Sequence, residues 1–136
     1  MSVAQTNLEK FGQLAELIPD RLHEAKGLLA DDFVWTYVNP LLPQIDGDYQ
    51  GADGFTDFFR RLGDLTNGTF SVRAKDVSTF GDELVVVHAA PSMTLDGETF
   101  ETNAAVVWRF VDGRIKQAWD IPAVYTIPVE LEGRAH

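Results

Sequence analysis

Residues 104–122, AAVVWRFVDGRIKQAWDIP, read as two β-strands joined by a tight turn. The Asp112-Gly113 pair is typical of a two-residue hairpin loop, because such loops need residues that tolerate positive φ angles. β-Branched and aromatic residues dominate both flanking segments, as they do in strands. The same signal recurs at Asp96-Gly97. The C-terminal half is therefore expected to form an antiparallel meander, with strands at 69–80, 84–95, 98–111 and 114–121.

The N-terminal half has helical periodicity instead. Apolar residues recur at three- and four-residue spacing in a first helix that Pro19 ends, in a short second helix capped by Asp20, and in a third helix, 52–65, capped by Asp53. These positions are Leu8, Phe11, Leu14, Ala15 and Ile18, then Leu22, Ala25, Leu28 and Leu29, then Phe55, Phe58, Phe59, Leu62 and Leu65. One strand, 33–38, precedes the third helix. The order αα-β-α-ββββ predicts an α+β fold, a mixed sheet with three helices on one face.

The length and charge of the chain limit its class. A chain of 136 residues is expected to be a single domain, 1–136. The net charge of −10, with no run of Lys or Arg, disfavours nucleic acid and anionic membranes as partners. No signal peptide and no apolar run of about 20 residues is evident, which favours a cytoplasmic protein.

The sequence also limits the chemistry. It has no cysteine, which excludes disulfides and thiolate nucleophiles. Its three histidines, His23, His88 and His136, are too scattered for a convincing metal site. No metal or organic cofactor is expected.

Asp120 stands between a tryptophan and an isoleucine, and an ionised carboxylate away from water is costly. If both Asp-Gly turns are two-residue loops, His88 pairs with Ala105 and Ala105 pairs with Asp120. If both are three-residue loops, His88 pairs with Ala104 and Ala104 pairs with Asp120. Either register places His88 and Asp120 on one face with room for a ligand atom between them, unless a bulge shifts one strand. The alternative is structural: Asp120 accepts backbone N–H groups, and His88 is a hydrogen-bonded core or surface residue.

The opposite face of the same strands is also apolar. With three-residue loops it carries Ala105, Val107, Trp119 and Ile121. With two-residue loops it carries Val106, Trp108, Trp119 and Ile121. An exposed apolar patch of this kind is most simply covered by a second copy of the chain. We expect a homodimer through the outer sheet face.

Three segments resemble a known superfamily: GLLADDFVWTYVNP (27–40), DYQGADGFTDFFRRL (48–62) and VVWRFVDGRIKQAWDIP (106–122). They are similar to the nuclear transport factor 2-like fold, and most of all to its branch of SnoaL-like polyketide cyclases and ketosteroid-isomerase-related proteins. The resemblance spans residues 8–126. It implies a cone-shaped, curved sheet with helices packed on its concave face and a deep apolar pocket between them.

The resemblance also suggests site residues. SnoaL-like cyclases keep an acidic residue at the place of Asp120, but the histidine common two residues earlier is Ala118 here, and a frequent polar site on the preceding strand is Val106. Ketosteroid isomerases place their base near Tyr37 and use a tyrosine of the first helix, whereas residues 1–29 contain no tyrosine. The Asp-Arg-Asp set of limonene epoxide hydrolases is not evident around Asp120.

These patterns together predict a small cofactor-independent enzyme of the isomerase or cyclase type. Asp120 and His88 would transfer a proton on a bulky apolar carbonyl compound. The ligand-binding residues are expected to be Trp35, Tyr37, Phe58, Val106 and Ala118. Trp35 and Tyr37 supply an N–H and an O–H donor, unless both rings are merely core.

Two other functions stay open. One is a non-catalytic binder of a small apolar metabolite, and the other is a dimeric association domain. The loop 39–51 either covers the binding site or packs on the core.

Overall fold

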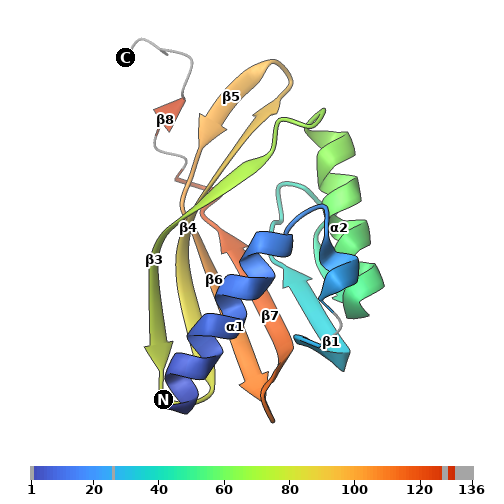
Figure 1. Ribbon diagram of the computed structural model, residues 1–136. Coiled ribbons are helices and arrows are strands. Elements are labelled where there is room, and N and C mark those ends of the chain that lie inside the picture. The colour runs from blue at the N-terminus through green and yellow to red at the C-terminus, as the bar shows by residue number, and fades with distance from the viewer. Residues whose placement is uncertain (1, 26, 127–128, 131–136) are drawn as a thin grey trace.

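The computed structural model describes residues 2–25, 27–126 and 129–130. The N-terminal half contains helix α1 (Val3–Leu17), the 3-10 helix η1 (Leu22–Glu24), strands β1 (Leu29–Tyr37) and β2 (Gly47–Gln50), and helix α2 (Gly51–Leu65). The C-terminal half contains β3 (Ser71–Phe80), β4 (Leu84–Leu95), β5 (Glu98–Glu101), β6 (Ala104–Val111), β7 (Arg114–Pro122) and β8 (Val129–Glu130). Figure 1 shows both α-helices lying along a strongly curved sheet.

The strands form one mixed sheet in the order β2-β1-β7-β6-β4-β5-β8, and β3 pairs with β4. β1 runs parallel to β7, and the other pairs are antiparallel. β4 pairs with β6 as far as Ala89 and with β5 from Ser92 onward. Because β4 changes its partner, the β4–β5 hairpin extends beyond the central strands. The helices and the mixed sheet together confirm the predicted α+β class.

The helical prediction needs three corrections. The expected second helix is only the 3-10 turn η1, preceded by Arg21 rather than capped by Asp20, and so the described residues contain two α-helices and not three. Gly27 disfavours continuation of a helix, and Leu29 already pairs with Ile115 of β7. α2 begins after Gln50, which makes Asp53 a first-turn residue stabilised by the helix dipole instead of the cap.

The strand prediction needs four corrections. β1 begins at Leu29 and not at residue 33, and β8 was not predicted. Segment 98–111 is two strands, because Thr102 and Asn103 leave the ladder; the Thr102 N–H donates to the Pro91 carbonyl at 3.0 Å instead. The short strand β2 inside the loop 39–51 was not predicted. Within that loop Ile45 is buried in the core, whereas Leu41 is 54% exposed.

Both hairpin turns are two-residue loops, the first of the two alternatives, with Leu95 opposite Glu98 and Val111 opposite Arg114. A bulge at Lys116 then shifts β7 by one residue. Because a one-residue shift moves every later side chain to the other face, the faces of β7 beyond the bulge are the reverse of those that an unbroken ladder would give.

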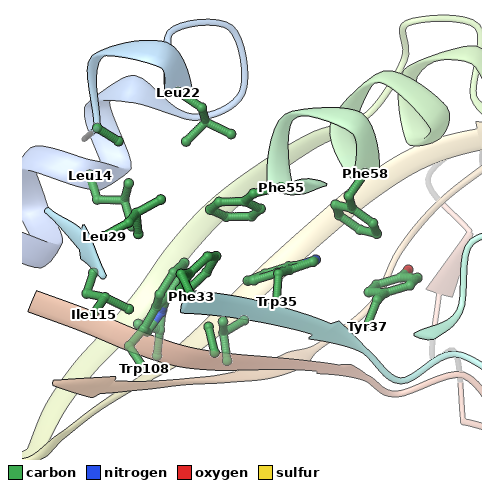
Figure 2. Close-up of a cluster of buried hydrophobic side chains, with 14 of the residues drawn as sticks. Leu14, Leu22, Leu29, Phe33, Trp35, Tyr37, Phe55, Phe58, Trp108 and Ile115 are labelled. Atoms are coloured by element: carbon green, nitrogen blue, oxygen red, sulfur yellow. The ribbon is translucent and has the colours of Figure 1, made fainter. Parts of the chain in front are cut away.

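The core fills the concave side of the sheet. Phe33, Trp35 and Tyr37 form a row on β1 beneath Phe55 and Phe58 of α2, as Figure 2 shows. The ring centroids of Trp35 and Phe55 lie 4.6 Å apart, and those of Tyr37 and Phe58 lie 4.8 Å apart. In the part of the chain that the structure describes, no helix is long and apolar enough to cross a membrane.

Candidate active site

A cavity of about 210 Å³ lies between α1, the C-terminal part of α2 and the concave face of the sheet. Its wall consists of apolar side chains from both helices and from β1, β3, β4 and β6, together with Asp120 of β7. Asp120 is the one ionisable residue that the described part of the chain contributes to this wall. The cavity therefore presents a single carboxyl group to any apolar molecule that enters it.

Asp120 is held between two strands. It pairs with Tyr37 of β1 on one side and with Val106 of β6 on the other, so both predicted partners, Ala105 and Ala104, are wrong. The side chain is half-buried, and within the described residues it forms no hydrogen bond or ion pair. Burial without a compensating partner raises the pKa of Asp120 from 3.8 to about 7. At neutral pH this carboxyl group exists in both protonation states.

His88 does not share this cavity. Its pairing with Ala105 is confirmed, but Ala105 lies opposite Ile121, and so His88 and Asp120 are on opposite faces of the sheet. The imidazole is exposed on the outer face, where its Nε2 lies 2.8 Å from Oδ1 of Asn103. The predicted placement of His88 beside Asp120 is therefore wrong. His23 is exposed on η1, and His136 lies outside the described residues.

The other predicted site residues divide into two groups. Trp35 and Val106 line the cavity, whereas Tyr37, Phe58 and Ala118 do not. Phe58 packs between the rings of Trp35 and Tyr37. Ala118 is fully buried between Trp35 and Trp108, its register neighbours, and its small side chain lets the two indole rings approach to 5.6 Å.

Tyr37 lies next to Asp120 and is buried. Its hydroxyl oxygen accepts a hydrogen bond from Nδ2 of Asn39 at 3.0 Å. Burial raises the pKa of Tyr37 to about 12, against the opposing effect of the Asn39 bond and with a smaller contribution from the charge of Asp120. Tyr37 thus keeps its proton at neutral pH and remains a hydrogen-bond donor.

The indole N–H groups of Trp35 and Trp108 are buried and have no hydrogen-bond partner among the described residues. An unpaired buried donor costs about 1–3 kcal/mol, so both groups favour any acceptor that reaches them. From the sequence, Trp108 was expected only on the outer face, in the register with two-residue loops. Two consecutive polar residues, Lys116 and Gln117, interrupt the alternation of β7 and are the signal that could have revealed the bulge.

Part of the wall was not predicted as a site. Phe11 of α1 and Ile18, which follows this helix, line the cavity. So do Phe70, which precedes β3, and Val72 and Ala74 at the start of β3. The alternating apolar positions 70, 72 and 74 were a readable sign that one face of this strand points inward.

Comparison with known proteins identifies the fold. The family model of the SnoaL-like domain matches residues 14–118, so the matched region ends two residues before Asp120. The structure of Bal32a from a soil-derived mobile gene cassette is similar with a TM-score of 0.79 and 20% identity over 93% of this chain and 95% of that one. An NTF2-like protein of unknown function from Burkholderia pseudomallei has a TM-score of 0.71 and 22% identity over 90% and 92% of the two chains.

A third structure is described as a putative SnoaL-like polyketide cyclase from Jannaschia sp. CCS1. It has a TM-score of 0.73 and 15% identity over 93% of this chain and 94% of that chain. No curated protein matches the sequence. These three structures are below 25% identical to this chain, so their similarity concerns the fold alone.

Proposed function

The chain belongs to the SnoaL-like domain family, and we propose that it is a small cofactor-independent enzyme in which Asp120 transfers a proton on an apolar carbonyl compound. The observation that carries this proposal is the lone carboxyl group in an apolar wall, with a pKa raised by burial to about 7. A proton carrier works best when its pKa lies near the working pH. An ordinary aspartate would be a far weaker base.

The reaction begins with ionised Asp120. The carboxylate removes a proton from the carbon next to the carbonyl group, which leaves protonated Asp120 and an enolate. A nearby hydrogen-bond donor, Tyr37 O–H or Trp35 N–H, stabilises the negative oxygen. Where the substrate carries a C=C bond next to this carbon, Asp120 then returns the proton to the far carbon of that bond, which moves the double bond into conjugation with the carbonyl group. In a cyclisation the enolate carbon attacks a second carbonyl carbon, and the new alkoxide takes up the proton from Asp120.

The volume of the cavity restricts the substrate. Sites for drug-sized ligands typically measure about 300–1,000 Å³, and this cavity measures about 210 Å³. The part of the substrate that it encloses is therefore compact, on the scale of one or two rings. The apolar wall selects against charged groups on that part.

The second candidate is a binding protein that holds an apolar metabolite without converting it. The apolar residues Val106 and Ala118 favour this reading, because they stand where relatives are expected to carry polar groups. Asp120 would then act only as a hydrogen-bonding group for the ligand. Binding and turnover must be measured separately to distinguish the two functions.

The variant Asp120→Asn separates them. In an enzyme, Asp120→Asn keeps ligand affinity within a few-fold but lowers turnover by about 10²–10⁴-fold, the usual contribution of one general base. The assay uses a panel of polyketide-like and steroid-like ketones. His88→Gln is the matched control, since it removes an ionisable side chain from the outer face and is expected to leave turnover unchanged. Equal behaviour of Asp120→Asn and the parent chain across the panel would leave only binding.

We further propose that two copies associate through the outer sheet face. Val107, Trp119 and Ile121 lie there together, and Ile121 is 46% exposed. This is the apolar set predicted for the register with Ala105 outward. Such a patch on a monomer is most simply covered by its symmetric copy.

A further inference from the structure

A second cavity, of about 190 Å³, lies beyond Tyr37. Its wall is formed by the loop 39–46, the β4–β5 hairpin and residues 122–124, and it is again apolar, with Leu41, Met93 and Phe100 among its side chains. Two buried polar residues of this wall, Tyr37 and Asn39, are hydrogen-bonded to each other. The proposed reaction in the first cavity does not use this space.

The loop over the second cavity is fixed by its own hydrogen bonds. The backbone N–H of Asn39 donates to the Asp46 carboxylate at 2.7 Å, and the N–H of Leu41 donates to Oδ1 of Asn39 at 3.1 Å. The Tyr49 hydroxyl donates to the Ile45 carbonyl at 2.6 Å. The second cavity is therefore built into the fold and does not need a ligand to shape it.

The two cavities lie on either side of one pair of residues. Asp120 lines the first cavity, Tyr37 lines the second, and the two are register neighbours on adjacent strands. Pro91 belongs to both walls. The Tyr37 hydroxyl accepts from Asn39, and its own proton has no acceptor within the described residues. A ligand oxygen at this boundary would find a free O–H donor beside the carboxyl group.

We propose that the second cavity is a subsite of the Asp120 site, and that the ligand carries apolar groups on both sides of a central carbonyl. One arm occupies the first cavity, the other arm occupies the second, and the carbonyl oxygen accepts a hydrogen bond from Tyr37. This inference rests on the proposed function, because Asp120 acts on the carbon beside that carbonyl. It assigns the substrate class as an internal ketone or a related carbonyl compound with two apolar arms.

Two isomers with equal composition test the inference. In 5-nonanone the carbonyl is central, and in 2-nonanone it is next to one end. Calorimetric titration is expected to give a dissociation constant for 5-nonanone about tenfold below that for 2-nonanone, because only the central ketone buries both arms while keeping its oxygen at Tyr37.

A matched pair of variants locates the effect. Leu95 lines the second cavity and precedes the Asp96-Gly97 turn, whereas Val111 precedes the Asp112-Gly113 turn and lines neither cavity. Leu95→Trp fills the subsite and is expected to abolish the preference for 5-nonanone. Val111→Trp, at the equivalent place in its hairpin, is expected to retain it.

The outcomes separate this inference from the function that it rests on. Equal affinity of the two ketones, or a preference that survives Leu95→Trp, would overturn the second subsite while leaving the Asp120 cavity intact. If neither ketone binds the parent chain, both the subsite and the carbonyl site are wrong. A preference that Leu95→Trp removes and Val111→Trp keeps supports the subsite.

Discussion

At the scale of single residues, Asp120 differs from surface carboxylates that are stabilised by basic side chains. Asp32 pairs with Lys116, and Asp57 pairs with Arg60 and Arg61, so the pKa values of Asp32 and Asp57 lie below the usual range. Asp120 has no such partner in the described residues, and its pKa is raised. The fold thus holds one carboxyl group in an unfavourable environment, which is typical of residues retained for chemistry.

This environment predicts how stability depends on pH. The folded-state pKa of Asp120 is about 7 and its ordinary value is 3.8, so the folded chain binds this proton more tightly than the unfolded chain. Stability is therefore lost as pH rises from about 4 to about 7, by an amount on the order of 4 kcal/mol. Asp120→Asn removes this loss of stability. The free energy of unfolding of Asp120→Asn relative to that of the parent chain is therefore expected to increase from pH 4.5 to pH 8.

Urea unfolding at the two pH values measures this difference. Asp20→Asn, which removes a charge from an exposed position, controls for the general effect of net charge. A stability difference between Asp120→Asn and the parent that stays constant over this pH range would contradict the buried, unpaired state of Asp120.

Tyr37 gives a second prediction at this scale. Tyr37→Phe removes the donor proposed for the substrate oxygen and is expected to lower turnover by about 10²–10³-fold, as loss of one such donor typically does. Tyr49→Phe is the matched control, because the Tyr49 hydroxyl bonds only to the Ile45 carbonyl and lines neither cavity. Steady-state kinetics on any turned-over ketone makes the comparison. Equal losses in both variants would show that Tyr37 acts through structure alone.

At the scale of elements, the bulge at Lys116 decides which residues meet in the cavity. It places Asp120 and Ala118 on the concave face, whereas Ala105 of β6 faces outward. An unbroken ladder would instead put Ala105 on the face of Asp120. The identity of the face therefore follows from one inserted residue and not from the turn chemistry.

A pair of alanine substitutions tests this arrangement. Ala118 is fully buried between Trp35 and Trp108, so Ala118→Leu overpacks the core and is expected to destabilise the fold by about 1–3 kcal/mol. Ala105 is exposed, and Ala105→Leu is expected to change stability by less than about 0.5 kcal/mol. Urea denaturation at one pH compares the two. An effect of Ala118→Leu as small as that of Ala105→Leu would mean that β7 lacks the bulge.

The sequence predicted elements better than it predicted their register. Helix α1, the strands of the meander and both two-residue turns follow from local periodicity and Asp-Gly chemistry, which short segments determine on their own. The helix expected around Leu28 failed because pairing with β7 outweighs helical spacing there. The pairing of His88 with Asp120 failed because a bulge depends on packing between strands, which a count from the turns does not include.

At the scale of the whole molecule, the apolar outer face predicts self-association. Val107→Asp introduces a charge beside Trp119, its register neighbour at the centre of this face. We expect the parent chain to elute as a dimer in size-exclusion chromatography with light scattering, and Val107→Asp to shift it to the monomer. Val77→Asp, a change of the same kind at a 37%-exposed position on β3 that lines neither cavity, is the control and should leave the dimer intact. A monomeric parent chain would refute the proposed interface.

The two faces of the sheet thus receive different roles. The concave face encloses an apolar cavity with Asp120, and the outer face carries the patch proposed for the partner copy. Family membership shows the fold, and this fold is compatible with catalysts and with binders. What decides between them is whether Asp120 takes a proton from a bound molecule.

The most direct test follows the exchange of α-protons. The parent chain is incubated with 5-nonanone in deuterated buffer, and loss of the α-proton signals is followed by nuclear magnetic resonance. We predict accelerated exchange that increases as pH rises through about 7, where Asp120 ionises, and that Asp120→Asn abolishes while His88→Gln preserves it. Exchange no faster than in buffer, or equally fast with Asp120→Asn, would contradict the proposed role of Asp120.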